Sequence, residues 1–303
     1  DGRDAIGMFG NDAGHQRKRK EHSYEIQKSS GGGHRLVSVL AAVATCLSMA
    51  ACGNQSGRSA GGNTTITIFN GATGTINENF NPFSPTALQP TLGIIYEPLY
   101  YYNVAKNAKP RPMLATGYKW NRDGDRLTIT TRKGVKWTDG KPFTAADVAK
   151  TFNIIHDTPA LNTSGLSASA KTIDSNHVAI LFPKKNSFIQ QDSILGNQAI
   201  VPEHIWKNVK NATSFVNSHP VGTGSFKLQK FNNQAYTLTA NENYWGGAPK
   251  IKQVRYISLA DADGATSALL AGKVDWMSAF IPNLKKILAG HKNISYTNSP
   301  NLT

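Results

Sequence analysis

The stretch MLATGYKWNRDGDRLTITTRKGVKWTDGKPFTAADVAKTFN, residues 113–153, joins a hairpin pattern to a helix pattern and so decides the fold class. Apolar and polar residues alternate on both sides of Asp123–Gly124, a dipeptide that favours tight turns between strands. We therefore predict a β-hairpin over residues 118–132.

The second half of this stretch carries the start signals of a helix. Thr144 can cap the helix N-terminus, and Asp147 stands three residues later, as in a capping box. Phe143 and Val148 occupy the two positions of a hydrophobic staple. One apolar stripe follows at helical spacing: Ala145, Val148, Ala149, Phe152 and Ile155. These residues are expected to pack in a core.

Strand and helix patterns alternate along the rest of the chain. Strands are expected over residues 64–70 and on both sides of Asn232–Asn233, where a second hairpin turns. Helices are expected over residues 88–96 and 262–271. The glycines in Gly222–Gly224 predict a turn that lets two backbone segments approach closely. A mixed α/β architecture follows.

The first 51 residues read as a signal or targeting segment rather than as part of the fold. No folded structure is expected before about residue 35, and a cluster of basic residues there precedes sixteen uncharged residues, 36–51. This apolar run is shorter than the roughly 20 residues of a membrane-spanning helix. The basic run RKRK, 17–20, could also serve as a nuclear address or nucleic-acid patch. An export-type apolar segment follows it at once, so we expect no nucleic-acid partner.

Cys52 follows Met49, Ala50 and Ala51, and this order resembles the lipobox of bacterial lipoproteins. The resemblance implies that Cys52 becomes the acylated first residue of the mature protein, whereas Cys46 is discarded with the signal. The alternative is a secretory signal cut nearby, with Cys52 left as an idle thiol. Residues 52–63 are rich in Gly, Ser and Asn and are expected to form a flexible tether.

The mature chain would be strongly basic. Residues 52–303 carry 26 Lys and Arg against 14 Asp and Glu, a net charge of +12. Such a charge favours anionic surroundings such as lipid head groups. A solvated basic surface without a specific partner explains it equally well.

Four motifs in their order resemble the extracellular solute-binding proteins of peptide-type ABC importers, family 5, the oligopeptide, dipeptide and nickel binding group. They are the stretch at 113–153, PVGTGSFKLQKF (220–231), NENYWGGAPKIKQVRY (241–256) and ALLAGKVDW (268–276). The resemblance covers nearly everything from Thr64 to about Pro282. It implies a two-lobed, periplasmic-binding-protein-like fold of type II with mixed sheets, which closes on its ligand by a hinge motion.

In this family an oligopeptide or dipeptide lies in the interlobe cleft, held through its backbone, and is delivered to ABC permease subunits. No bond is made or broken, so the resemblance implies neither enzyme activity nor a cofactor. With the signal and the lipid on Cys52, we expect an exported monomer that is anchored to the outer face of the cell membrane.

Family members are considerably longer than this chain, so the resemblance implies that the second lobe is largely missing. The expected organisation is a signal segment (1–51), a tether (52–63), a first lobe (64–275) and the start of the second lobe (276–303). The acidic group that usually receives the peptide's amino terminus would lie in the missing part. We therefore expect weak peptide binding, or none, from these 303 residues.

Motif position nominates two groups of ligand-contacting residues. The segment after the first strand supplies Asn81, Phe83, Ser84 and Thr86, and the strand after GKVDW supplies Met277, Ser278, Ala279 and Phe280. For Phe83 and Phe280, core packing is the competing explanation. We assign Trp137, Trp245 and the tyrosines at 100–102 to packing.

The sequence has no phosphate-binding G-x-x-x-x-G-K-[ST] loop and no H-E-x-x-H, and its G-x-S-x-G spacing, GRSAG at 57–61, falls in the expected tether rather than at a strand-to-helix elbow. The histidines are scattered without ligand spacing, so no metal site is expected, and helix capping accounts for the Asp261 and Asp263 pair. Three alternatives stay open: a nickel or haem binder, a surface lipoprotein for adhesion or sensing, and, more distantly, a secreted hydrolase.

Overall fold

The computed structural model describes residues 22–28, 64–103, 109–162, 168–279 and 281–300. The expected lipidation site Cys52, the tether at 52–63, most of the signal segment and Phe280 lie outside these residues.

The described residues form thirteen strands and four α-helices, joined by several short 3-10 turns and one π-helical turn. The strands are β1 (His22–Lys28), β2 (Thr65–Phe69), β3 (Tyr100–Tyr101), β4 (Arg111–Pro112), β5 (Ala115–Trp120), β6 (Arg126–Thr131), β7 (Ser169–Thr172), β8 (His177–Leu181), β9 (Phe226–Asn232), β10 (Ala235–Ala240), β11 (Gln253–Ile257), β12 (Trp276–Ala279) and β13 (Ile294–Pro300). The helices are α1 (Ala145–Asp157), α2 (Glu203–Trp206), α3 (Ala262–Leu270) and α4 (Leu284–Ile287).

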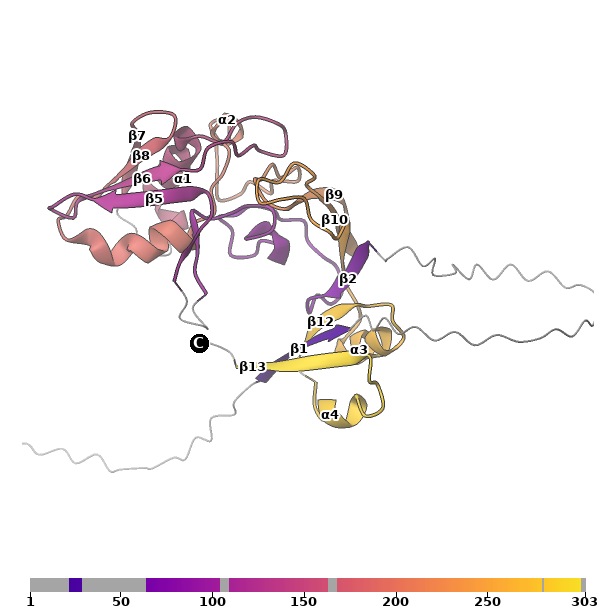
Figure 1. The fold of residues 1–303 in the computed structure, drawn as a ribbon. Helices are drawn as coiled ribbons and strands as arrows, with labels where there is room; N and C mark the ends of the chain where they lie inside the picture. The colour runs from indigo at the N-terminus through magenta and orange to yellow at the C-terminus, as the bar shows by residue number, and fades with distance from the viewer. Residues whose placement is uncertain (1–21, 29–63, 104–108, 163–167, 280, 301–303) are drawn as a thin grey trace, which may run out of the picture.

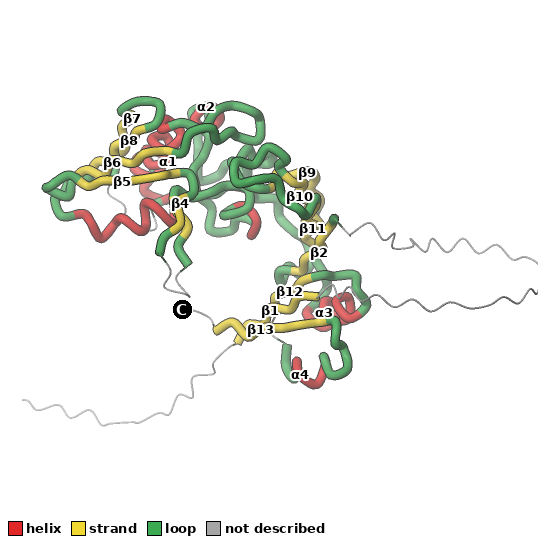
Figure 2. The backbone as a smooth tube through the Cα atoms, in the orientation of Figure 1, coloured by secondary structure: helices red, strands yellow, loops and turns green. Residues whose placement is uncertain are grey.

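Two main sheets organise the molecule. A four-stranded antiparallel sheet has the order β5-β6-β8-β7, and α1 packs against β7 and β8. A seven-stranded mixed sheet has the order β13-β1-β12-β2-β11-β10-β9. Figures 1 and 2 show the four-stranded sheet at one end of the molecule and β12, β13, α3 and α4 at the other, with β2 between them.

Strand β1 differs from the expectation that nothing before about residue 35 folds. It lies between β12 and β13 and runs antiparallel to both, with Ile26 opposite Met277 on one side and Tyr296 on the other. Tyr24 and Ile26 alternate with polar residues, which is a strand pattern that basic residues nearby obscured. Among the described strands, β13 joins the sheet through β1.

The hairpin and helix predicted from residues 113–153 are confirmed. β5 and β6 pair across the turn at residues 121–125, and α1 begins after Thr144. The Thr144 hydroxyl accepts from the Ala146 N–H at 3.3 Å, and the Asp147 carboxylate accepts from the Thr144 N–H at 2.7 Å. The second hairpin, β9–β10, is also confirmed.

The helix expected over residues 88–96 is wrong. Only Gln89–Thr91 form a 3-10 turn, because Gly93 adopts a left-handed backbone with φ 84° and reverses the chain. The Tyr96 N–H then bonds to the Thr91 carbonyl at 2.9 Å, five residues back rather than four. The apolar residues in this segment had suggested a longer regular element than the glycine permits.

Two hydrophobic cores fill the molecule. The large core gathers side chains from residues 76–256, with Trp137, Trp206, Tyr96, Tyr236 and Phe80 among its largest fully buried members. The small core consists of Phe69, Ala265, Leu269, Val274, Met277, Ile281, Leu284 and Leu288. It takes residues from both sides of position 275, so the boundary expected there falls inside one core. Strand β2 serves both cores, since Ile68 packs against the large one and Phe69 belongs to the small one.

Glu97 is the most deeply buried charged group of the large core, with 1% of its surface exposed. Its carboxylate accepts from the Tyr244 hydroxyl at 2.5 Å, the Trp245 indole N–H at 2.8 Å and the Thr223 hydroxyl at 2.9 Å. Burial raises the pKa of the Glu97 carboxyl, while these three bonds and the nearby Arg132 act in the opposite direction. Glu97 thereby ties three loops together.

The predicted close approach at residues 222–224 is confirmed. A Cβ added to Gly222 would lie 1.8 Å from the Ile95 carbonyl oxygen, and one added to Gly224 would lie 2.0 Å from that of Ile94. Trp137 packs with 2% exposure, as expected for a structural residue. No side chain larger than hydrogen fits at either glycine without a backbone shift.

Candidate functional site

Three parallel strands end at the same side of the seven-stranded sheet. β2 runs parallel to β11 and to β12, with Ile68 opposite both Tyr256 and Trp276. In open sheets with parallel strands, ligands bind outside the carboxyl ends of those strands, where the strand order reverses. β2 lies between β11 and β12 in the sheet, so the segments that follow the three strands come together at this edge.

The loops at these ends form what we call the carboxyl-end site, made of residues 70–74, 258–259 and 278–279. Leu259 donates its N–H to the Ala72 carbonyl at 3.2 Å, and the Ser258 hydroxyl donates to the Gly74 carbonyl at 2.5 Å. These bonds fix the loop after β2 against the end of β11. The loop itself stays exposed at Gly71, Thr73 and Gly74.

Gly71 opens this site toward β12. It adopts φ 92°, and a Cβ placed there would lie 3.9 Å from the Ser278 carbonyl oxygen. The absence of a side chain at Gly71 leaves the backbone of β12 approachable from the loop side. Gly71 was not among the predicted residues; its signal in the sequence is a glycine two residues after a strand pattern.

Asp275 fixes the position of β12 relative to β2. Its carboxylate accepts from the Thr67 N–H at 2.9 Å, and its own N–H donates to the Thr67 carbonyl at 2.9 Å. Asp275, the residue before β12, therefore satisfies both the N–H and the carbonyl of Thr67 in β2. This pair sets the register that places Met277 beside Phe69 and Ser278 beside the loop after β2.

The second predicted group lies at this site. Met277 is fully buried in the small core, so its side chain supports the strand from behind. Ser278 and Ala279 are half-buried, on a strand whose Ser278 carbonyl faces Gly71. Phe280 lies outside the described residues. Ser278 and Ala279 remain the ligand-contact candidates of this group.

The first predicted group lies against the large core instead. Asn81 is 1% exposed, its amide donates to the Ala212 carbonyl at 2.7 Å, and its oxygen accepts from the Phe83 N–H at 2.9 Å. Phe83 packs edge-on against Trp206 with ring centroids 5.0 Å apart. Both side chains already have partners inside the protein, which favours a structural role for them.

Ser84 and Thr86 come together in a polar cluster with Asn79. The Asn79 amide donates to the Ser84 hydroxyl at 2.8 Å and to the Thr86 hydroxyl at 3.0 Å. Thr86 is exposed and Ser84 is half-buried, so both can still exchange hydrogen bonds with a solute. The structure thus assigns the two predicted groups to different cores.

The carboxyl-end site offers backbone groups and small hydroxyls. The nearest acidic residue in sequence, Asp261, is occupied as the N-cap of α3 and accepts from the Gly264 N–H at 2.7 Å, which confirms the capping expected for it. Backbone and hydroxyl groups suit a ligand that presents many amide or hydroxyl groups rather than one strong charge.

Two surface hollows lie elsewhere. One of 410 Å³ runs along β9 beside Pro220 and Val221, and one of 330 Å³ lies between the turn at 136–140 and residues 240–243. Neither is lined by any of the eight predicted residues. Within the described ranges we find no group of three or more His, Cys, Asp or Glu placed to hold a metal ion. No helix in the described part of the chain combines the length and apolarity needed to cross a bilayer.

Comparison with known proteins gives one consistent result. The family model for bacterial extracellular solute-binding proteins, family 5 (middle region), matches residues 109–303, which is more than half of the chain. An ABC transporter peptide-binding protein of Brucella ovis is 29% identical over 208 residues, covering 65% of this chain and 38% of that protein. The glutathione-binding protein GsiB of Salmonella choleraesuis is 27% identical over 239 residues, covering 75% of this chain and 46% of that protein.

A solved structure shows the same arrangement. The periplasmic oligopeptide-binding protein of Thermotoga maritima, crystallised with bound mannohexaose, superposes with a TM-score of 0.68 at 28% identity. The superposition covers 75% of this chain and 44% of that structure. The chain thus spans less than half the length of the relatives that it matches, and its mixed α/β fold is that of periplasmic binding proteins.

Proposed function

The chain belongs to the bacterial extracellular solute-binding proteins of family 5, and from this membership we propose that it captures peptides noncovalently for uptake by an ABC importer. The carboxyl-end site would form one wall of the capture cleft. The observation that carries the proposal is the exposed loop after β2, whose Gly71 leaves the β12 backbone at Ser278 approachable. A peptide offers the same N–H and C=O groups at every residue, so backbone contacts suit ligands of varied sequence.

Ser278 and Ala279 would contact the peptide directly, and Ser84 and Thr86 would contact a longer ligand that reaches the large core. Asn81, Phe83 and Met277 would support this wall from inside. The ligand would be delivered to the permease subunits, and acylated Cys52 would hold the monomeric protein at the outer face of the membrane. Intact-mass analysis of membrane fractions tests the anchor, since an unmodified thiol at Cys52 would contradict it.

Photo-crosslinking tests the proposed wall and the ligand class together. A pentapeptide mixture that carries benzophenone should label residues 70–74 and 278–279, and unlabelled peptides should compete. Mannohexaose and nickel–histidine serve as competitors of the other ligand classes. Crosslinks confined to the hollow beside β9, or competition by the sugar alone, would contradict peptide capture at this wall.

A matched variant sharpens this experiment. Gly71→Val fills the approach to Ser278 without touching either core, because Gly71 is exposed. It also strains the backbone, since a φ of 92° disfavours any side chain. Labelling at residue 278 should fall several-fold. Gly134→Val, also exposed and at positive φ (78°) but outside the site and with no atom within 4 Å of an added Cβ, controls for the backbone strain.

A further inference from the structure

The loop that follows β8 is fastened to the turn of the β5–β6 hairpin. The Asn186 N–H donates to the Asp123 carbonyl at 3.0 Å, and the Ser187 N–H donates to the Gly124 carbonyl at 2.9 Å. Asn186 adopts the left-handed backbone with φ 58°, a conformation that asparagine tolerates well. The loop and the hairpin turn therefore form one rigid end of the four-stranded sheet, which is the end that β5 and β6 reach at the far left of Figure 1.

Two large apolar side chains, Phe188 and Ile189, are exposed to solvent at this end of the four-stranded sheet. Phe188 packs on Trp120, with ring centroids 5.0 Å apart, and fills the space above Gly124, yet 45% of its surface is exposed. Ile189 next to it is 91% exposed, the highest value among the large apolar residues of the described chain. The Trp120 indole donates to Gln191 at 3.0 Å and Gln191 donates to the Tyr118 hydroxyl at 3.1 Å, so the loop is held on both sides of Ile189. Collapse onto the protein is thereby prevented.

Basic residues outnumber acidic ones at the end of the sheet that carries the exposed pair. Residues 184–189, which we call the 184–189 tip, carry Lys184 and Lys185 four residues before Phe188 and Ile189. On the adjoining hairpin and loop, the charged residues are Lys119, Arg122 and Arg126 against Asp123, Asp125 and Asp192, and Asp123 pairs with Lys185 at 3.2 Å. Five basic groups thus face three acidic ones at this end.

We propose that the 184–189 tip is a contact site for an anionic bilayer surface. Phe188 and Ile189 would enter the interfacial region, and the lysines would lie at the phosphates, where their aliphatic stems stay in apolar contact while the ammonium groups face water. Each basic group near an anionic leaflet adds attraction, and a rigid apolar tip adds burial that electrostatics alone does not supply. The contact goes beyond solute capture and does not depend on it.

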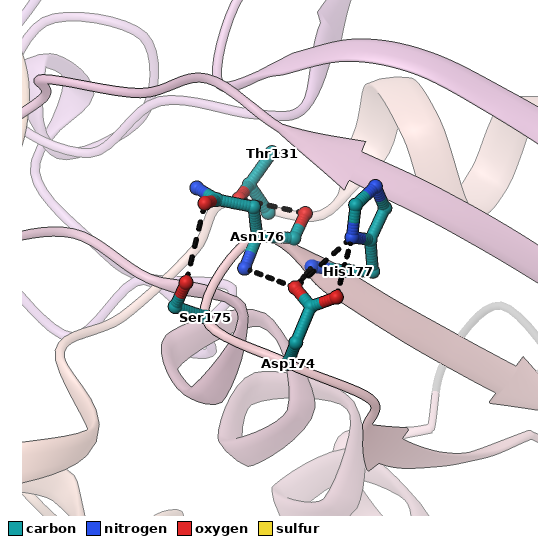
Figure 3. A network of polar contacts seen from close by, with 5 residues as sticks. All are labelled: Thr131, Asp174, Ser175, Asn176 and His177. Atoms are coloured by element: carbon teal, nitrogen blue, oxygen red, sulfur yellow. Dashed lines mark hydrogen bonds and ion pairs between the residues drawn. The ribbon is translucent and has the colours of Figure 1, made fainter.

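The opposite end of the same sheet provides a built-in control. There Ile173 is 56% exposed at the turn between β7 and β8, with Asp174 directly after it and the single Lys171 two residues before it. Figure 3 shows Asp174 held by the Asn176 and His177 N–H groups at 2.7 and 2.9 Å and by the His177 ring. Ile173 is thus an exposed isoleucine of similar setting beside a fixed acidic group, which an anionic surface repels.

Depth-dependent quenching tests the proposal on the full chain. The apolar segment at residues 36–51 can itself bind vesicles, so the experiment reads the depth of one position rather than total binding. Ile189→Trp and Ile173→Trp each add one indole at a solvent-exposed site, where folding is not disturbed. Both are measured against the parent chain in vesicles of brominated phosphatidylcholine, with and without phosphatidylglycerol. The indole added by Ile189→Trp should be quenched at least about twice as strongly in anionic vesicles as that added by Ile173→Trp.

Charge-matched variants complete the test. Lys184→Gln with Lys185→Gln, in the Ile189→Trp background, should lower the quenched fraction about twofold or more. Lys285→Gln with Lys286→Gln, in α4, removes the same charge elsewhere and should leave it unchanged. Equal quenching at positions 189 and 173, quenching that ignores phosphatidylglycerol, or equal loss in both lysine pairs would overturn the bilayer contact. An unquenched tip would instead favour a protein as its partner.

Discussion

The large core and the small core are built on different principles. In the large core, irregular loops are joined by buried polar groups with several partners each, as at Glu97 and at Asn217, whose amide donates to the Phe80 carbonyl and the Tyr96 hydroxyl at 2.8 and 2.9 Å. The small core is purely aliphatic and aromatic, and short strands hold it through the Asp275–Thr67 pair and backbone ladders. In the large core, individual side-chain hydrogen bonds thus fix the conformation of each loop. In the small core, the pairing of strands fixes the structure.

This difference has a functional meaning, because the carboxyl-end site lies where the two meet. Strand β2 gives Ile68 to one core and Phe69 to the other, and the loop that follows it faces β12. A binding protein that closes on its ligand needs one rigid part and one part whose position can adjust. Substitutions in the large core should therefore cost stability, and substitutions in the small core should mainly move the site.

The largest effect is expected from Glu97→Ala. The change leaves the Trp245 N–H and the Tyr244 and Thr223 hydroxyls without their acceptor in a buried setting, which should cost about 3–5 kcal/mol of unfolding free energy. Denaturant unfolding followed by tryptophan fluorescence measures it. A loss below about 1 kcal/mol would show that the polar network does not lock the large core.

Gly222→Ala should cause the second-largest loss of unfolding free energy. Its Cβ would overlap the Ile95 carbonyl oxygen at 1.8 Å, so two backbone segments must move apart, at a cost of about 1–3 kcal/mol. Gly117→Ala, where an added Cβ meets nothing within 4 Å, is the matched control and should be nearly neutral. Equal melting temperatures for the two variants would refute the close approach.

Asp275→Ala tests the small core and should cost about 1–2 kcal/mol, because the Thr67 N–H loses its acceptor in a half-buried position. The part of the molecule that loses protection from hydrogen exchange is more informative than the size of the loss. Hydrogen exchange should accelerate at β12 and the loop after β2 while the four-stranded sheet keeps its protection. Asp275→Asn retains an acceptor oxygen and should restore slow exchange; uniform acceleration across both cores would remove the distinction between them.

Thr144→Ala should cost about 1 kcal/mol, since the Ala146 N–H loses its cap while Asp147 still accepts from the Thr144 N–H. The loss should be confined to the body with the large core and leave exchange at β12 unchanged. Thermal unfolding together with exchange at both places measures it.

The smallest effect concerns an exposed acid. The pKa of Asp174 is lowered chiefly by the hydrogen bond from the Asn176 N–H and further by His177. A lowered folded-state pKa means that this stabilisation is present above the usual pKa of aspartate and is lost as the pH falls through the folded value. His177→Ala should raise the Asp174 pKa part of the way back, as followed by NMR titration. An unchanged Asp174 titration would show that His177 does not contribute to the lowered pKa of Asp174.

Most helices and strands could be predicted from the sequence, whereas the carboxyl-end site could be predicted only in part. Thr144 with Asp147 marked the start of α1, and Asn232–Asn233 marked the β9–β10 turn, because these signals act over three or four residues. Gly93 defeated the helix expected over 88–96, since one left-handed residue outweighs an apolar pattern. The proximity of Gly71 to Ser278 depends on the pairing of Phe69 with Met277, 208 residues apart in sequence, which local signals do not encode.

We infer that the carboxyl ends of β2, β11 and β12 form a wall that binds peptide backbone. Amide chemical shifts of the isotope-labelled chain, followed during titration with a tripeptide-to-pentapeptide mixture, test it most directly because they detect even weak binding. We expect saturable shifts at residues 70–74 and 278–279, which Gly71→Val abolishes and Gly134→Val retains. Saturable shifts located only elsewhere, or none at millimolar peptide, would contradict it.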